Sequence, residues 1–446
     1  MKKEWLLTVG VVVVTLLVSL GVIRWQAPGL LGIQSDLQLV QVSKKVPPFY
    51  EGVFRRKDIT TDKFILSDPY TRTRGRPLWP AGLGPGPNDI LGFRNLEVPD
   101  VSDVVVLGDS QTYGINEMLP FNWPNQMKMM LAGKNATVYA MATDGWSAIQ
   151  YLYMVKYATL FKPRVIVIAY YTGNDPLECF MMAYGDPQWK QLRPDHSLSS
   201  SDLPKVSPKI PNSERWEVTF KDGITTTFTP KYRLASNQDT PVVHAGYEIM
   251  LSAAQQIADI ATQRGVHVIF TIIPTKELVY ARKVESEKLH APPDYERLIV
   301  AEKANIERLA KGLIAIKNAD YIDLVNPLQK TAMGKRVLYR RGIDGHPAPG
   351  GYEVIARTLT PAVGKYLPGT PLGLVAVHFV KGDNRSWPLL AKRNGTWLFA
   401  NNKLIMQNGW DLKKITTVSP RDVATLPLRG VIDHVDPSIY GPESLK

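Results

Sequence analysis

Short apolar runs alternate with longer amphipathic segments between residues 101 and 366. The short runs are rich in β-branched residues and bounded by polar or glycine-containing stretches, as is typical of strands buried on both faces of a sheet. We therefore predict five strands: Val101–Leu107, Thr137–Ala142, Arg164–Tyr171, Val266–Ile273 and Tyr321–Val325.

The longer segments between these runs have apolar residues at helical spacing. We predict helices around Pro124–Ala132, Ala148–Phe161, Tyr247–Arg264, Tyr295–Ile316 and Gly351–Tyr366. Strands that alternate with helices favour βαβ units, so the pattern indicates an α/β fold with a mostly parallel five-stranded sheet.

Two stretches depart from this alternation. Residues 185–240 are rich in Ser, Pro and Lys, and are interpreted as an insertion near the mouth of the site, with a hairpin in which Trp216–Phe220 pairs with Ile224–Phe228. Residues 367–446 are interpreted as a small β-rich extension. Its predicted strands are Gly373–Val380, Thr396–Phe399 and Lys403–Met406.

The N-terminus carries an uncharged run, Trp5–Ile23, preceded by Lys2 and Lys3. About 19 residues form about 28 Å of helix, close to the hydrocarbon thickness of a bilayer. We expect residues 5–23 to span the lipid bilayer once, with the N-terminus cytoplasmic and the body exported to the periplasmic or extracellular side. A cleaved signal peptide and a buried soluble helix are the alternatives.

The region between this run and the first strand is rich in Pro and Gly and is interpreted as an irregular juxtamembrane wrap. The predicted organisation is therefore a transmembrane anchor, the wrap, an α/β domain and the β-rich extension: residues 1–25, 26–100, 101–366 and 367–446.

Composition narrows the functional classes. The 446 residues include 53 Lys and Arg against 41 Asp and Glu, a net charge of +12, which favours anionic neighbours. With the exported body, lipid or polysaccharide fits better than nucleic acid, which we do not expect as a partner. The single cysteine, Cys179, excludes an internal disulfide and a multi-cysteine metal site. No nucleotide-binding or zinc-protease motif is present, so we expect neither cofactor nor metal.

Polar residue clusters follow three of the predicted strands and precede the last helix: Gly108-Asp109-Ser110, Ala142-Thr143-Asp144-Gly145, Tyr171-Thr172-Gly173-Asn174-Asp175 and Asp344-Gly345-His346-Pro347. The carboxyl edge of a parallel sheet is where open α/β folds build their sites. Together, these clusters contain the residue types that acyl transfer requires.

Each residue type indicates a role. Ser110 carries a hydroxyl that attacks an ester carbonyl, and His346 accepts its proton and returns it to the leaving group. Asp344 would orient the imidazole, because residues two apart in an extended segment project to the same side. The backbone N–H groups of Ser110 and Gly145 and the amide of Asn174 would form the oxyanion hole.

In their order, Ser110, Gly145, Asn174 and His346 resemble the four blocks of the SGNH (GDSL-type) hydrolase superfamily. The resemblance covers about residues 88 to 365 and includes Gly92-Phe93-Arg94-Asn95, Trp123-Pro124 and Gly351-Tyr352. It implies a flavodoxin-like three-layer α/β/α sandwich, and serine-dependent removal or transfer of acyl groups from esters, including acetylated polysaccharides and lipids.

One feature departs from the superfamily's pattern. Many members space the acid and base as Asp-x-x-His, whereas one residue separates Asp344 from His346 here. The segment Val268–Glu277 is also similar to envelope proteins related to polysaccharide O-acetyltransferases. Lys276 and Glu277 are interpreted either as lining the cleft or as the start of a helix. Arg340 and Arg341 are interpreted either as contacts for an anionic substrate or as surface residues.

Two functions remain open at this point. The first is a membrane-anchored, exported serine esterase, or an O-acyltransferase, that acts on an esterified envelope polysaccharide or lipid through Ser110, His346 and Asp344. The second is a non-catalytic accessory subunit of a larger membrane complex, with an SGNH-like body, since fold does not guarantee function.

Overall fold

A computed structural model describes the chain from residue 64 onward, in the ranges 64–80, 86–131, 136–204, 209–367, 373–377, 387–392, 395–418 and 428–435. The predicted anchor at residues 5–23 lies outside the described residues. Within these ranges, no helix has the length and apolar composition that a bilayer crossing requires.

A five-stranded sheet forms the centre of the α/β region, and all of its strands are parallel. The strand order is β4-β3-β5-β8-β9, the flavodoxin-like 2-1-3-4-5 arrangement. All five predicted strands are present: β3 (Val104–Gly108), β4 (Val138–Ala142), β5 (Val165–Tyr171), β8 (His267–Ile273) and β9 (Ala319–Asp323).

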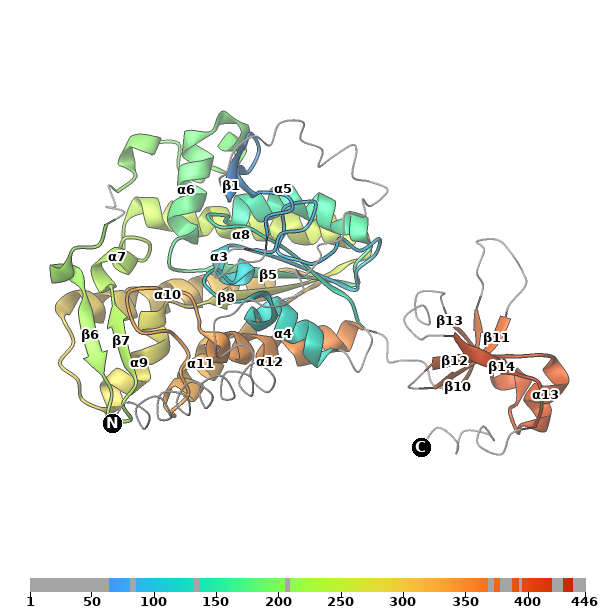
Figure 1. The fold of residues 1–446 in the computed structure, drawn as a ribbon. Coiled ribbons are helices and arrows are strands. Elements are labelled where there is room, and N and C mark those ends of the chain that lie inside the picture. Colours follow the sequence, from blue (N-terminus) through green and yellow to red (C-terminus); the bar gives the residue numbers. More distant parts are fainter. Residues whose placement is uncertain are drawn as a thin grey trace, which may run out of the picture.

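Helices cover both faces of this sheet, which confirms the three-layer sandwich (Figure 1). One face packs against α5 (Ala148–Ala158), α6 (Asp175–Gly185), α8 (Pro241–Gln263) and much of α10 (Pro293–Ala315). The opposite face packs against α4 (Trp123–Met130), α9 (Lys276–Ser286), α11 (Val325–Ala332) and α12 (Pro349–Tyr366).

The central strands are apolar on both sides because both faces are covered. Every residue of β3 and β5 is buried. Alternate residues point to opposite faces, so Val105 and Leu107 join the α5 and α8 side, while Val104 and Val106 join the α4 and α12 side. Because these strands are packed on both faces, the loops that follow their carboxyl ends begin from a rigid sheet.

The segment that precedes β3 contains a hairpin of β1 (Ile65–Asp68) and β2 (Arg72–Gly75), followed by irregular chain. Two residues of the sequence block 92–95 attach the segment before β3 to the α/β domain. The buried Arg94 donates to the carbonyls of Tyr113, Gly114 and Glu117, directly after the Ser110 turn. The Asn95 amide both donates to and accepts from the backbone of Ala140 on the edge strand.

The insertion carries the predicted hairpin, because β6 (Trp216–Thr219) pairs antiparallel with β7 (Thr225–Phe228). Its aromatic side chains pack on Tyr280 of α9 and Tyr295 of α10. The short helix α7 (Pro230–Leu234) follows. Single 3-10 turns complete this part of the chain at Pro187–Leu192, Ser200–Asp202 and Asn212–Glu214.

The C-terminal segment forms its own five-stranded sheet, in the order β13-β10-β11-β12-β14. Leu390, Phe399, Ile405 and Trp410 belong to its separate core. The predicted strand Lys403–Met406 is wrong: these residues lie in helix α13 (Asn402–Gln407), which the Asn401 side chain caps. The strands are β10 (Gly373–Val377), β11 (Trp387–Lys392), β12 (Gly395–Phe399), β13 (Thr416–Val418) and β14 (Leu428–Ile432), and a 3-10 turn covers Leu412–Lys414.

Candidate active site

Ser110 lies in the turn that leaves the carboxyl end of the central strand β3 and begins the one-turn helix α3 (Ser110–Tyr113). Asp109 caps this turn by accepting from the backbone N–H of Gln111 at 2.9 Å. Gly108 has no room for a side chain, because an added Cβ would lie 2.0 Å from the Thr112 hydroxyl. The Gly-Asp-Ser sequence therefore builds a tight strand-to-helix turn that leaves Ser110 at the sheet edge.

The structure brings Ser110, His346 and Asp344 together into one hydrogen-bonded relay. Ser110 Oγ and His346 Nε2 are 2.8 Å apart, and His346 Nδ1 and Asp344 Oδ1 are 2.6 Å apart. A carboxylate only accepts, so Nδ1 donates to Asp344, and Nε2 is left to accept the Ser110 proton. The one-residue Asp-Gly-His spacing thus forms the relay without the commoner two-residue spacing.

Both oxygens of Asp344 are occupied by donors. Oδ1 also accepts the backbone N–H of His346 at 3.0 Å, and Oδ2 accepts from the Asn116 side chain at 2.8 Å. Burial by itself raises the pKa of Asp344, but the contacts with His346 and Asn116 outweigh it and lower the pKa to about 2. Asp344 is therefore ionised at neutral pH and able to stabilise an imidazolium at position 346.

Gly145 and Asn174 lie in the loops that follow β4 and β5, the strands on either side of β3. Gly108 is in register with Ala142 of β4 and with Ala169 of β5, so the loops that follow all three strands leave the same edge side by side. Gly145 has φ +73°, which favours glycine, and the space where its side chain would stand is open. Asn174 is half-buried at the N-cap of α6. The loops that carry Gly145 and Asn174 therefore leave the sheet edge on either side of the Ser110 turn.

Two further carboxyls lie fully buried beside the relay, at Asp109 and Asp175. Burial raises the pKa of Asp109 to about 7 and that of Asp175 well above its usual range. Asp175 Oδ2 accepts from the Tyr171 backbone at 3.1 Å. One oxygen of each carboxyl lacks a hydrogen-bond partner among the described residues. At neutral pH, these two buried carboxyls therefore carry less negative charge than Asp344 does.

Lys276 and Glu277 do not line an open cleft, because each is only 1% exposed. They form the first turn of α9, as one of the two interpretations predicts. The Glu277 side chain accepts from the backbone N–H of Thr229 at 2.8 Å. Arg340 pairs with the buried Glu117, and Arg341 pairs with Glu217 on the surface.

Sequence reasoning missed two residues at the site, Asn116 and Arg233. Asn116 has φ +68°, and an Asn before a charged residue is a weak turn signal that says nothing of its contact with Asp344. Arg233 lies over the Tyr171 ring, and its guanidinium would be 2.4 Å from a Cβ at Gly345. A side chain at position 345 would therefore require the Arg233 guanidinium to move.

A cavity of about 280 Å³ borders Asn174 on the side of α6. The insertion contributes Leu203, Pro204 and Tyr232 to its wall, opposite Leu177 and Met181 of α6. The insertion thus lies near the site, as the sequence predicts, and it shapes the surface next to the expected oxyanion hole.

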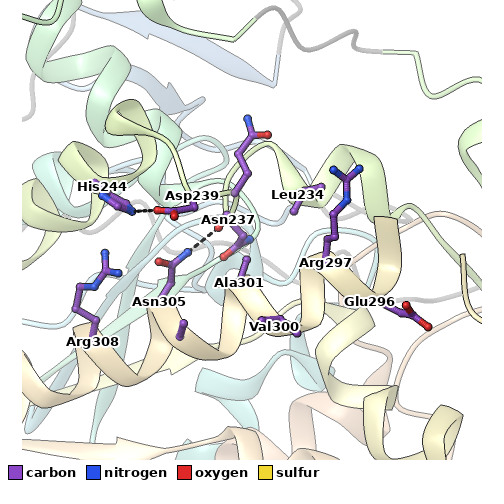
Figure 2. A pocket seen from close by; sticks show the side chains of 12 residues that line it. Leu234, Asn237, Asp239, His244, Glu296, Arg297, Val300, Ala301, Asn305 and Arg308 are labelled. Carbon is purple, nitrogen blue, oxygen red and sulfur yellow. Dashed lines mark hydrogen bonds and ion pairs between the residues drawn. The ribbon is translucent and has the colours of Figure 1, made fainter. Parts of the chain in front are cut away.

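A second cavity, of about 620 Å³, lies between α8, α10 and the loop before α8 (Figure 2). His244 pairs with Asp239 at 2.6 Å, and Asn305 donates to the Asn237 carbonyl at 2.8 Å on its wall. No residue of the Ser110 relay lines this cavity. It is therefore separate from the candidate active site.

Solved structures similar to this chain include lipases, acylhydrolases and esterases. A GDSL-like lipase from Bacteroides thetaiotaomicron is 13% identical, covering 59% of this chain and 88% of its own, with a TM-score of 0.31. The psychrotrophic esterase EstA from Pseudoalteromonas sp. is 10% identical over 59% and 97%, with a TM-score of 0.30. A catalytic mutant of the acetylxylan esterase Axe2 from Geobacillus stearothermophilus is 9% identical over 60% and 96%, with a TM-score of 0.33.

No protein-family description and no curated protein matches the chain. With such low identities and TM-scores, the reaction must be inferred from the geometry of the site itself.

Proposed function

We propose that this protein is a serine-dependent acyl hydrolase that cleaves esters through Ser110, His346 and Asp344. The observation that carries the proposal is the continuous relay, with 2.8 Å between Ser110 Oγ and His346 Nε2 and 2.6 Å between His346 Nδ1 and Asp344 Oδ1. A nucleophile, a base that accepts its proton and an ionised group that orients the base are the parts that nucleophilic acyl transfer needs.

In the first half of the proposed reaction, Ser110 Oγ attacks the ester carbonyl while its proton passes to His346 Nε2. The carbonyl oxygen becomes an oxyanion, which the N–H groups of Ser110 and Gly145 and the Asn174 amide stabilise. The tetrahedral intermediate then collapses, the alcohol leaves with the proton held by His346, and an acyl-serine remains. Asp344 stays ionised throughout, in keeping with its pKa of about 2.

In the second half, water gives its proton to His346 and attacks the acyl-serine, which releases the carboxylic acid and restores Ser110. A sugar hydroxyl in place of water makes the same site an O-acyltransferase, since both reactions share the acyl-enzyme. The mechanism therefore covers both forms of the proposed activity.

We place this activity at a membrane, on an esterified envelope polysaccharide or lipid. The supports are the apolar run at residues 5–23, the lysines before it and the net charge of +12, which favours anionic surroundings. In this arrangement the anchor holds the exported catalytic body beside its substrate. Partner subunits of a membrane complex remain part of the same proposal.

The decisive experiment is fluorophosphonate labelling of the purified 446-residue chain, read by intact mass. We expect one adduct per chain in the wild type, none in Ser110→Ala, and one in Ser201→Ala, which removes an exposed serine of the insertion. An unlabelled wild type that unfolds cooperatively on heating would refute the hydrolase and favour the accessory subunit.

A second assay tests whether water or a sugar hydroxyl accepts the acyl group. The wild type is incubated with an acetylated oligosaccharide, with and without an unacetylated acceptor, and the products are separated by mass. Free acetate alone identifies a hydrolase, whereas acetylated acceptor identifies a transferase. Ser110→Ala is the control for both products.

A further inference from the structure

A buried lysine lies directly behind the loop that carries Asp344 and His346. Lys276 is the first residue of α9, on the sheet face opposite α5 and α8, and only 1% of it is exposed. Its ammonium group donates to three backbone carbonyls: Thr227 at 2.8 Å, Gly342 at 2.8 Å and Asp344 at 3.0 Å. It is therefore saturated by acceptors that come from two different segments.

This placement is unfavourable in itself. Burying an ammonium group is strongly unfavourable unless other groups compensate for its lost hydration. A cation at a helix N-terminus also opposes the helix dipole. An uncharged or acidic residue would stabilise the start of a helix better than a lysine does. The three carbonyl contacts therefore stabilise the buried ammonium group of Lys276 at this position.

The three acceptors connect the insertion to the catalytic loop. Thr227 belongs to strand β7 of the hairpin, while Gly342 and Asp344 belong to the loop that ends in His346. A bridge between Tyr339 and Pro347 joins the two ends of that loop. Between these ends, Lys276 binds the loop through the backbone carbonyls of Gly342 and Asp344.

We propose that Lys276 is a positioning residue: by holding the carbonyls of Gly342 and Asp344, it sets the position of the Asp344–His346 pair relative to Ser110. This inference rests on the proposed function. It adds a residue that touches neither substrate nor the reacting atoms, and it makes the insertion hairpin part of the support for the site.

The three acceptors match the three N–H bonds of an ammonium group. A neutral amine has two N–H bonds and a lone pair, so one carbonyl would lose its donor and face the lone pair. The charged groups around Lys276 are Glu277 on α9, Arg233 on α7 and Asp344 on the catalytic loop. Burial, assisted by Arg233 and opposed by the two carboxylates, lowers the pKa of Lys276 to about 8. The support for the loop should therefore weaken above about pH 8.

The test measures the second-order rate of fluorophosphonate labelling of the full chain between pH 6 and pH 10. The variants are Lys276→Met, which keeps length without charge, and Lys276→Arg, which keeps charge at every pH used. Lys283→Met is the matched control, because Lys283 is also buried on α9 but pairs with Asp222 and the Gly334 carbonyl, away from the relay.

We expect the wild-type rate to fall above about pH 8, as Lys276 loses its proton. Lys276→Met should label about 100-fold more slowly at pH 7, the size of effect that a displacement of about 1 Å produces. Lys276→Arg should recover part of that rate and show no fall above pH 8. Lys283→Met should lose thermal stability but keep the wild-type rate and pH profile.

A folded Lys276→Met with the wild-type rate and pH profile would overturn the inference while leaving the hydrolase intact. Labelling that is absent from every protein, the wild type included, would instead remove the proposed function. If Lys276→Met does not fold, the wild type and Lys276→Arg decide alone: identical profiles above pH 8 overturn the positioning role, and a fall in the wild type only supports it.

Discussion

The carboxylate on the loop above Ser110 and the carboxyls beneath it have opposite environments. Asp344 is 31% exposed in its side chain, and both its oxygens accept hydrogen bonds. Asp109 and Asp175 are fully buried, and each has an oxygen without a partner among the described residues. The pKa of Asp344 is accordingly low, whereas those of Asp109 and Asp175 are high.

Because of this difference, the negative charge of the three carboxyl groups is concentrated on Asp344. In the proposed reaction, positive charge develops on His346 when Ser110 gives up its proton, and the ionised carboxylate of Asp344 lies against His346 Nδ1. The raised pKa values of Asp109 and Asp175 reduce the negative charge that would repel the oxyanion of this reaction. Burial and hydrogen bonding, rather than residue type, therefore divide three aspartates into one electrostatic partner and two structural groups.

The largest effect is expected for Asp344→Asn. The amide occupies the same space but donates toward His346 Nδ1, which favours the wrong imidazole tautomer and leaves no negative charge. We expect the hydrolysis rate constant for p-nitrophenyl acetate to fall by about 10⁴-fold. The melting temperature at neutral pH should also fall, because the ionised Asp344 stabilises the folded state. A tenfold loss or less would mean that Asp344 does not orient His346.

Asn174→Ala is expected to produce the next largest effect. Loss of one oxyanion donor costs about 10²- to 10³-fold in kcat, with KM little changed because the interaction forms in the transition state. Asn305→Ala, which alters an amide on the wall of the second cavity, is the control and should leave kcat unchanged. A selective rise in KM for Asn174→Ala would contradict its assignment to the oxyanion hole.

Asp109→Asn should change stability more than activity. The folded-state pKa of Asp109 is raised from 3.8 to about 7, so this group makes the fold less stable as pH rises through that interval. Asn keeps the helix cap and removes the buried charge. We expect its unfolding free energy in urea to exceed that of the wild type by about 1–3 kcal/mol at pH 8, and the gain to shrink at pH 4. An equal gain at both values would contradict the pKa shift.

Asp344 predicts the opposite dependence on pH. Its folded-state pKa is lowered to about 2, so its contribution to stability is complete above about pH 4 and is lost as pH falls toward 2. Asp344→Asn should therefore lose less stability than the wild type when urea unfolding is compared at pH 4.5 and pH 2.5. The two aspartate variants thus test the comparison from both sides.

Asn116→Ala is expected to have the smallest effect. It removes an exposed side chain that donates to Asp344 Oδ2, so activity should fall by about two- to tenfold, which corresponds to one ordinary hydrogen bond. Asn116→Asp tests the same contact more severely, because two negatively charged carboxylates, at positions 116 and 344, would then face each other. Unchanged activity in both variants would show that the imidazole contact alone holds the carboxylate.

The central fold can be predicted from the sequence because β3 and β5 are buried on both faces. Each of these strands therefore has a continuous apolar run in the sequence. The relay residues follow from short motifs at strand ends, and the structure brings them within hydrogen-bonding distance. The contacts of Lys276 and Asn116 do not follow, because each joins distant parts of the chain and no short motif marks either residue. The helix at Asn402–Gln407 was mistaken for a strand because a short apolar run fits either period.

The order of the relay along the chain has a consequence for biosynthesis. Ser110 and His346 are separated by 236 positions, and the loop of His346 comes after the last strand of the sheet. A growing polypeptide therefore presents its nucleophile long before its base emerges. Such a distant contact forms only when the whole α/β region has closed. Enzymatic competence should consequently appear as one late event, and partly synthesised or truncated chains should be inert toward the esters around them.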